Sequence, residues 1–406
     1  MEYPKFPTDQ ESIYQRLLDF SPRKYDQTHH HLDGQVSLLS PYITHGFLTL
    51  PMIKSALVAR FGEKEGYGFM FDLAMREYFQ RIFWRYGEKA LWNAFEAKKT
   101  TVEYEKFMPE NIIKGVTGIK ILDQQLGSLC EVGYMHKKAR QWFASYLTHY
   151  TATDWKLGAK LFFYHLLDGD LAANNLSWQG VTGTFSDKPF LFNQEGINSY
   201  VEEQYREEGN VIDDSLENLQ ERFLVQHRFL LTDNLRLPLE LKSHFEEIEN
   251  ELSSEEQIIN EMNNCNEVIY IHEWMINEFQ IAEFDQDHHC YRLMVIDKDF
   301  WTKNPASAKR FRFMVELAKN IPNVRIYLGN PVELFKKIAL RRGEERGALK
   351  IYSREYFSDR IKQVFTSLYC ARKVDLEVWP YDWMFPNLTV VANRFSKFFA
   401  LVERSL

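Results

Sequence analysis

The segment from Gly133 to Trp178 concentrates charged and polar residues in a helical, largely apolar stretch. Arg140 lies in KKAR, and Asp168 and Asp170 form an Asp-Gly-Asp sequence. Because an unpaired buried charge is very costly, we expect the arginine to pair with these carboxylates. Apolar helices seldom carry this much polarity without a ligand that satisfies it. The segment therefore predicts a charged, ligand-holding site, although a purely structural ion pair, with Asn174 as a helix cap, has the same residues.

Other groups of residues that could do chemistry give weaker signals. His29, His30 and His31 are consecutive, but no further ligand stands at metal-binding spacing, so a surface loop is preferred and no metal site is predicted. The sequence contains neither a GxGxxG nor a GxxxxGK(S/T) phosphate-binding motif. Asp297 and Asp299 follow an expected strand, and there a helix start is preferred over a ribose or magnesium site.

Length and composition set the broad class. A chain of 406 residues is too long for one core, so we expect two domains with connecting material. The four cysteines are scattered without a CxxC pair, which indicates a reducing compartment. The amino terminus has no signal pattern, and no apolar run approaches the roughly 18–20 residues of a membrane span. We therefore expect a soluble cytoplasmic protein with no membrane contact.

The elements that must position these residues fall into three segments. Residues 1–200 show apolar residues at helical spacing, notably in 69–86 and 154–168, and predict a helical domain. Residues 201–264 hold 17 acidic and 5 basic residues, a local charge of −12 within a total of −8, and predict an acidic helical connector.

The last segment, residues 265–406, alternates short apolar runs with helical patterns. This alternation predicts βαβ units and a doubly wound, mostly parallel, five-stranded α/β domain. The expected strands are 267–271, 292–296, 323–328, 348–352 and 375–379.

The segment 133–178 closely resembles the flavin-binding core of the photolyase and cryptochrome family. The resemblance implies FAD as the cofactor, with Arg140 and Asp168 paired against the flavin ring and Asp170 nearby. It also places His136 among the cofactor-binding residues. Asn174, in AANN, falls where the family keeps the side chain that faces flavin N5, and an amide there would accept a hydrogen bond from protonated N5.

Two further motifs support the resemblance. GQVSLLSPYITHGF, residues 34–47, is similar to the family's GTSxLSPYLxFG element, which holds the flavin diphosphate. It matches at Ser37, Leu39 and Ser40, whereas Val36 replaces a usual threonine. Tyr25 corresponds to a tyrosine on the adenine or phosphate side. MREYFQRIFWRYG, residues 75–87, resembles WREFxRxLxxxxG, and Arg76 matches its arginine.

The resemblance also implies a route for electrons. Trp178 and Trp155 match the proximal and middle members of the tryptophan chain that reduces photoexcited flavin in the family. The third, surface member has no clear counterpart. The candidates are Tyr104, Trp84, Trp92 and Trp142.

The lesion-binding side departs from the family pattern. Met75 and Gly180 stand where cyclobutane-dimer photolyases have stacking tryptophans, and Asp72, Lys137 and Gln141 occupy the other three lesion positions. The histidines of (6-4) photolyases are also replaced, by Lys137 and Gln141. Base–aromatic stacking contributes roughly 1–3 kcal/mol per base, which these replacements remove. Lys137, Lys138 and Gln141 remain DNA-contact candidates, weighed against a solvated helix face.

The order of the segments differs from the family, in which the α/β domain comes first. KRFRFMVELAKNIPNVRIYLGNPVELFKKI, residues 309–338, is similar to the family's amino-terminal domain, as is 352–365. Both lie after the flavin-binding pattern. We therefore expect a circular permutation, which is tolerable because each domain keeps its own core.

Three functions follow from the resemblance. The first is a cryptochrome-like light sensor that reduces FAD through Trp178 and Trp155 and signals to a protein partner. The second is a DNA photolyase with a non-standard lesion pocket, and Asn174 supports it. The third is a flavoprotein whose FAD only stabilises the fold. A second, antenna chromophore (folate, deazaflavin or flavin) would sit in the α/β domain, but no motif selects one.

Overall fold

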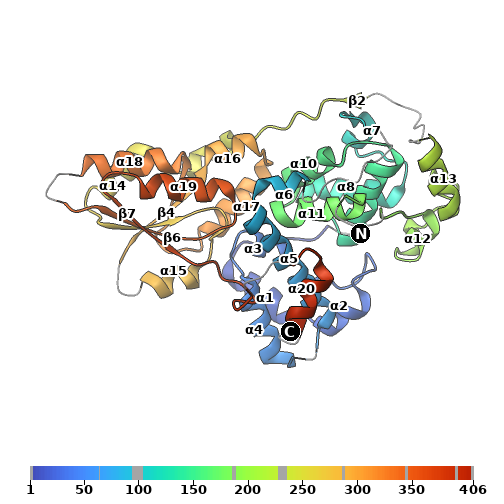
Figure 1. The fold of residues 1–406 in the computed structure, drawn as a ribbon, viewed down its shortest axis with the longest axis horizontal. Coiled ribbons are helices and arrows are strands. Elements are labelled where there is room, and N and C mark those ends of the chain that lie inside the picture. Colours follow the sequence, from blue (N-terminus) through green and yellow to red (C-terminus); the bar gives the residue numbers. More distant parts are fainter. Residues whose placement is uncertain are drawn as a thin grey trace.

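The computed structural model describes residues 3–63, 65–93, 104–184, 189–226, 236–285, 289–342, 346–388 and 392–403. A helical part and an α/β part lie side by side along the long axis of the molecule (Figure 1). The helical part comes first in the chain, and a five-stranded parallel sheet with interleaved helices follows it. This confirms the predicted fold class.

Polar caps start many of the helices in the first part, and glycines end several of them. Asp154 and Asp170 cap the two helices that flank the Asp-Gly-Asp turn, and Gly87 and Gly133 end two others with positive φ angles of 67° and 73°. The helices are α1 (Gln10–Asp19), α2 (Pro22–Thr28), α3 (Ser40–Thr44), α4 (Leu50–Phe61), α5 (Tyr67–Tyr86), α6 (Glu88–Asn93), α7 (Glu110–Ile113), α8 (Lys120–Val132), α9 (Lys137–Ser145), the π-helical turn η1 (Tyr146–Tyr150), α10 (Trp155–His165), α11 (Leu171–Thr182) and α12 (Gln194–Asn198).

The connecting segment is only partly helical. It carries η2 (Glu203–Tyr205), α13 (Leu216–Gln226), η3 (Phe245–Glu247), η4 (Glu249–Glu251) and α14 (Glu255–Met262). Between α13 and η3 the short strand β2 (Arg236–Leu237) pairs antiparallel with β1 (Met108–Pro109) of the helical part. The chain then runs along one side of the molecule toward the sheet (Figure 1). The predicted domain boundaries at residues 200 and 265 remain predictions.

The sheet has the strand order β5-β4-β3-β6-β7, with all strands parallel. Its central strands are buried because helices cover both faces, which explains their nearly continuous apolar runs. Figure 1 shows α14, α18 and α19 on one side of the sheet and α15 on the other. The elements are β3 (Glu267–Ile271), α15 (Glu278–Asp285), β4 (Tyr291–Asp297), α16 (Lys298–Lys303), α17 (Ala308–Ala318), β5 (Arg325–Gly329), α18 (Pro331–Arg341), β6 (Leu349–Arg354), α19 (Asp359–Tyr369), β7 (Val374–Trp379) and α20 (Phe395–Val402).

The carboxyl ends of the strands face the helical part. After β3, the carbonyl of Glu273 contacts His45 Nδ1 at 3.1 Å, and Asn277 Nδ2 donates to the Phe47 carbonyl at 3.0 Å. One apolar core runs through both parts, because buried residues of α3–α5 and of the sheet belong to the same cluster. The two parts are therefore packed against each other, with a polar contact zone at the end of β3.

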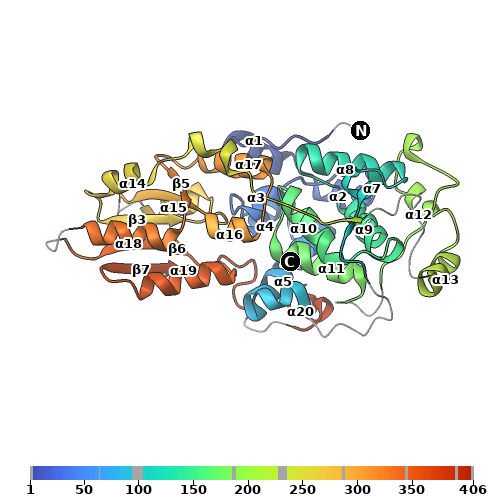
Figure 2. The same cartoon turned by 90° about the horizontal axis from the view of Figure 1, so that it is seen from above.

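The last helix returns to the helical part. In α20, Phe395 and Phe399 contact Phe71 of α5 with ring centroids 4.9 Å and 4.8 Å apart. Figures 1 and 2 both show α20 beside α5. Just before it, Arg81 of α5 donates to the carbonyls of Phe385 and Leu388 at 2.7 Å and 2.8 Å. The last helix therefore packs on α5, which carries the predicted flavin-site residue Arg76.

Two general features of the described residues bear on the sequence predictions. No helix among them has both the length and the apolar character needed to cross a membrane. No cluster of three or more histidine, cysteine, aspartate or glutamate side chains in the same residues is arranged to hold a metal ion.

Candidate flavin site

Arg140 and Asp168 form the ion pair that the charge argument predicts. Arg140 Nη2 lies 3.0 Å from each carboxylate oxygen of Asp168, and its Nε donates to the Met135 carbonyl at 2.8 Å. Burial alone would raise the pKa of Asp168, but the Arg140 guanidinium, the Ser40 hydroxyl and Arg76 outweigh it and hold that pKa below its usual value. The carboxylate is therefore ionised at neutral pH.

The start of α3 and the loop before it reach the same pair. Ser40 Oγ donates to Asp168 Oδ2 at 2.6 Å, and the Leu39 amide donates to Ser37 Oγ at 3.3 Å. Leu38 between them has a φ of 53°, a conformation that leucine rarely adopts, and such strain is typical of functional loops. Because α3 has only five residues, hydroxyls and backbone amides, rather than a large helix dipole, would hold an anion here.

Arg76 connects this loop to the Asp-Gly-Asp turn. Its Nη2 donates to Thr44 Oγ1 at 2.6 Å and lies 3.5 Å from Asp170 Oδ2. Asp170 is 1% exposed, and its other oxygen accepts from the Ala173 amide at 2.8 Å as the N-cap of α11. Thr44 was not among the predicted site residues, although it lies inside the quoted motif 34–47.

His136 carries a buried donor that makes no hydrogen bond within the described residues. Its Nδ1 accepts from the Lys138 amide at 3.1 Å, so in the neutral ring the proton is on Nε2. Burial, followed by the charges of Arg140, His29 and Lys137, lowers the pKa of His136 to about 3. The ring is therefore neutral at pH 7 and presents an Nε2–H group.

Asn174 has its carbonyl oxygen available. Its Nδ2 donates to the Ala159 carbonyl at 2.9 Å and to Asn175 Oδ1 at 3.0 Å, which uses both amide hydrogens. No hydrogen bond to Asn174 Oδ1 is found in the described part of the chain. A ligand beside α11 would therefore meet an acceptor at this position.

The polar atoms that lack partners fit a bound cofactor. Among the described residues, Arg76 Nε, His136 Nε2 and Asp170 Oδ2 are buried without a hydrogen bond. Buried polar groups in proteins are nearly always satisfied, so these three atoms leave hydrogen-bonding capacity that a bound ligand would complete. All three residues belong to the predicted cofactor-binding set. Two of the atoms are donors and the carboxylate oxygen is an acceptor, a combination that suits the carbonyl and amide groups of a flavin.

The lesion-side residues hold one another. Lys137 Nζ lies 2.5 Å from Asp72 Oδ1, and the hydroxyl of Tyr25 donates to the other oxygen of Asp72. Lys138 Nζ lies 4.6 Å above the ring of Tyr200. Burial and then Asp72 raise the pKa of Tyr25, which stays a neutral donor. Two of the three DNA-contact candidates thus have partners within the chain, and Gln141 is half-buried on the same helix.

The two predicted tryptophans belong to neighbouring helices, Trp155 to α10 and Trp178 to α11. Trp155 and Trp178 are 7% and 2% exposed. Trp178 packs against the backbone of α10 so closely that a Cβ at Gly158 would lie 2.1 Å from its ring. Gly158 is one turn after Trp155, so both rings lie on the same side of the helix.

Among the four candidates for the third ring, only Trp92 contacts Trp155. Its ring lies 6.2 Å from that of Trp155 with an interplanar angle of 25°, and Trp92 is half-buried. Trp142 is buried against Phe192 instead, and Trp84 pairs with Trp383 of the α/β part. Tertiary structure therefore makes a distinction that the sequence alone left open.

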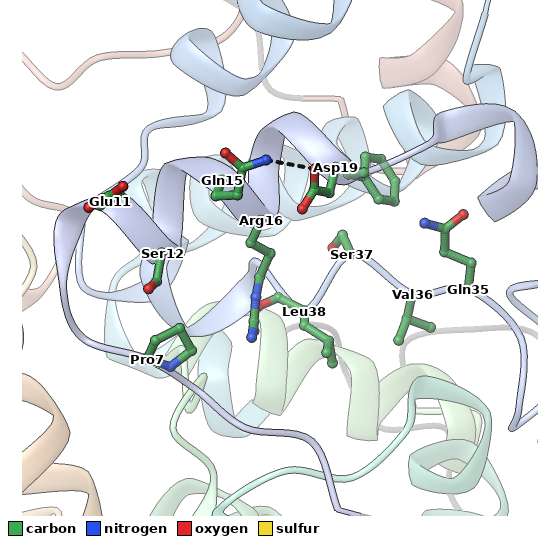
Figure 3. A pocket seen from close by; sticks show the side chains of 11 residues that line it. Pro7, Glu11, Ser12, Gln15, Arg16, Asp19, Gln35, Val36, Ser37 and Leu38 are labelled. Carbon is green, nitrogen blue, oxygen red and sulfur yellow. Dashed lines mark hydrogen bonds between the residues drawn. The ribbon is translucent and has the colours of Figure 1, made fainter.

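A surface hollow of about 570 Å³ lies beside the loop rather than at the ion pair. Figure 3 shows residues 35–38 along one side of it and Gln15, Arg16 and Asp19 of α1 along another. Arg16 spans it to donate to the Leu38 carbonyl at 3.4 Å. Of the predicted cofactor-binding residues only Ser37 lines this hollow, so it is an extension of the loop surface and not the flavin site itself.

Comparison with known proteins identifies the helical part. The family model "FAD binding domain of DNA photolyase" matches residues 69–221. The deoxyribodipyrimidine photo-lyase of Streptomyces griseus is 32% identical over 167 residues, which cover 40% of this chain and 36% of that protein. A cryptochrome DASH of Idiomarina loihiensis is 33% identical over 174 residues, covering 40% and 38%, and that of Danio rerio is 29% identical over 153 residues, covering 36% and 29%.

These matches define a flavoprotein with an FAD-binding domain. The chain belongs to the photolyase and cryptochrome family. Its FAD-binding domain, residues 69–221, precedes the parallel sheet of residues 267–379, an order consistent with circular permutation. The chain spans less than two fifths of the length of each of the three relatives.

Proposed function

We propose that FAD binds between α9 and the Asp-Gly-Asp turn. Arg140 and Asp168 would lie against the ring system, and Arg76, His136 and Asp170 would complete their hydrogen bonds on it. Tyr25, Ser37, Leu39 and Ser40 would hold the phosphate side. The three buried polar atoms that lack a hydrogen bond support this placement. Bound there, FAD would supply a group that absorbs blue light and exchanges electrons.

We propose that the protein is a cryptochrome-like light sensor. The observation that carries this proposal is the Asp72–Lys137 ion pair at 2.5 Å, closed by the Tyr25 hydroxyl. Two charged residues at lesion-binding positions, Asp72 and Lys137, therefore pair with each other. Gly180, at a former stacking position, carries no side chain that could stack on a base. The flavin-side residues Arg76, Arg140 and Asp168, in contrast, match the family pattern.

The electron route of the sensor would run through Trp92, Trp155 and Trp178. Trp92 is half-buried and would exchange electrons with solvent, and its ring is near-parallel to that of Trp155. Trp178 would be the ring next to the cofactor. The output would be a change sensed by a protein partner, for which the acidic segment 201–264 is the candidate surface.

Replacement of Trp178 by Phe tests the route. Blue-light reduction of the bound flavin, followed by absorption, should slow by at least about tenfold in Trp178→Phe because the first donor is lost. Trp142→Phe is the matched control, since Trp142 is equally buried but contacts Phe192 instead. Unchanged photoreduction in Trp178→Phe would show that electrons arrive by another path, or that FAD has only a structural role.

A DNA photolyase is the second candidate function, favoured by the free carbonyl oxygen of Asn174. Such an acceptor would stabilise protonated flavin N5, the form that donates electrons in repair. Lys138 and Gln141 would then contact DNA. Repair of cyclobutane or (6-4) lesions under blue light separates the two functions: quantitative repair of either would refute the sensor, and none would refute the photolyase.

We propose further that the α/β part carries no antenna chromophore in its sheet crevice. The pocket at the carboxyl ends of β3, β6 and β7, between the two parts, has a volume of about 30 Å³. Trp274 and Tyr356 fill the crevice, stacked 4.7 Å apart at 3°. The absorption spectrum of the purified protein should therefore contain FAD bands alone, and a second pigment in stoichiometric amount would contradict this.

A further inference from the structure

One charged side chain of the α/β part is buried at the contact with the helical part. Arg310, in the first turn of α17, is 0% exposed. Its Nη1 donates to the Phe163 carbonyl at 2.5 Å, and its Nη2 donates to the Gly169 carbonyl at 2.6 Å. The guanidinium also lies 4.4 Å from the centre of the Phe163 ring and 5.0 Å from that of Trp301. Nothing in the sequence pattern had singled out this residue.

The two carbonyls belong to the segment that shapes the flavin site. Phe163 is in the last turn of α10, where carbonyls lack helical partners and attract a cation. Gly169 is the centre of the Asp168–Asp170 turn, and a Cβ there would lie 2.5 Å from Arg310 Nη1. Arg310 therefore holds the link between α10, which carries Trp155, and α11, which carries Asn174.

The charge of Arg310 has no carboxylate at contact distance within the described residues, and its Nε is buried without a partner. Burial lowers the pKa of Arg310 to about 10, against the opposing effect of Asp168 and Asp170. The guanidinium is thus charged at pH 7, and the two flavin-site carboxylates balance it at a distance. A buried cation retained without a direct partner is expensive, which indicates a role beyond packing.

Two neighbouring contacts dock the same end of α17. The Ser307 amide donates to the Tyr164 carbonyl at 2.9 Å, and Lys309 Nζ donates to the Cys130 carbonyl at 2.5 Å. Three residues within four positions thus bind backbone carbonyls of α8, α10 and the turn. The orientation of Arg310 is fixed by the docking of the α/β part itself.

We propose that Arg310 is a positioning residue for the flavin site, through which the docked α/β part fixes the Asp168–Asp170 turn and adds positive potential beside the cofactor. This rests on the proposed binding of FAD at that turn. A nearby buried cation stabilises a reduced, more negative cofactor relative to an oxidised one. The α/β part would thereby raise the reduction potential of the flavin as well as its affinity.

The test compares Arg310→Met with Arg312→Met, which lies two residues away on α17 but is exposed and pairs with Glu247 at 3.3 Å. We expect FAD to dissociate about tenfold more readily from Arg310→Met, and its potential to fall by about 30 mV for each tenfold change in the two-electron equilibrium. Arg312→Met should match the wild type. Arg310→Lys keeps the charge and should retain most of the potential while losing affinity.

Hydrogen exchange at residues 163–170 gives a readout that needs no flavin. The amides of Leu166 and Gly169, which are bonded within this turn, should exchange faster in Arg310→Met and not in Arg312→Met. If Arg310→Met does not fold, Gly169→Ala disturbs the same contact from the helical side with the charge retained, and should weaken FAD binding with little change in potential.

The outcomes separate this proposal from the proposed function. Wild-type protein that binds no FAD would refute the proposed function. Hydrogen exchange at the Asp168–Asp170 turn would then show by itself whether Arg310 positions that turn. Folded Arg310→Met protein with wild-type affinity, potential and exchange would overturn the proposal. A fall in affinity that Arg312→Met shows equally would overturn it too, because the effect would then belong to the helix and not to the buried cation.

Discussion

At the scale of single residues, Asp168 is the centre of the candidate site. Its two oxygens accept from Arg140 and Ser40, which come from segments 28 and 128 positions away. The carboxylate is 8% exposed, so its charge depends on those partners rather than on water. Removing it would leave the Arg140 guanidinium, whose side chain is 25% exposed, without its counter-ion.

We predict that Asp168→Asn binds FAD poorly and is destabilised by about 3 kcal/mol, because loss of one partner strands the other charge. Flavin content after purification and denaturant unfolding are the measurements. The control is Glu316→Gln, which breaks the exposed Glu316–Lys319 pair and should change stability by less than about 1 kcal/mol. Full flavin content in Asp168→Asn would contradict our placement of the site.

At the scale of elements, the packing of α11 on α10 sets the position of Trp178. The helices approach closely at Gly158, where the tryptophan ring takes the place of a side chain. At Gly180, two residues after Trp178 on α11, no atom of the described residues lies within 4 Å of an added Cβ. These two helical glycines therefore differ in what an added methyl group would meet.

Gly158→Ala should destabilise the protein by about 1–3 kcal/mol because the new Cβ overlaps the Trp178 ring. Gly180→Ala should be neutral or stabilise by about 0.5–1 kcal/mol, since alanine is the better helix former and no atom of the described residues lies within 4 Å of the new Cβ. Both are read from denaturant unfolding. Equal effects of the two substitutions would show that α10 and α11 are not packed as described.

At the scale of the whole molecule, several histidines are buried in uncharged form. Burial lowers the pKa values of His45 and His136 to about 3, and those of His149 and His272 to about 4. All four are at most 4% exposed and are distributed over the helical part and the end of β3. Each has an unfolded pKa of about 6.5, so the unfolded chain binds more protons at acid pH.

Burial of these four histidines in neutral form stabilises the folded state fully above pH 6.5. This stabilisation is lost as pH falls from 6.5 toward the pKa values in the folded protein. We predict a decline of about 1.4 kcal/mol per pH unit for each histidine between pH 6.5 and 4. Denaturant unfolding at several pH values measures it. His45→Gln should lower the slope, whereas substitution of the exposed His31 should leave it unchanged; identical slopes in wild type and His45→Gln would refute the account.

The sequence by itself determined the local features. Short apolar runs, separated by helical patterns, predicted both ends of all five strands of the sheet to within two residues. They did so because buried parallel strands need continuous apolar side chains. The pairing of Arg140 with an acidic residue of the Asp-Gly-Asp sequence also followed from charge alone. Such features depend on whether each side chain must be buried, and this requirement is directly visible in the composition and spacing of the sequence.

Tertiary structure decided which distant residues meet. Lys137 gives its charge to Asp72, 65 positions away, and Trp92 rather than Trp84 or Trp142 lies beside Trp155. Arg310 reaches the Asp168–Asp170 turn from a segment 141 positions later, across the contact between the two parts. Periodicity carries no information about such encounters, because they depend on how whole elements pack. The residues of the site could be read from the chain, but their partners only from the fold.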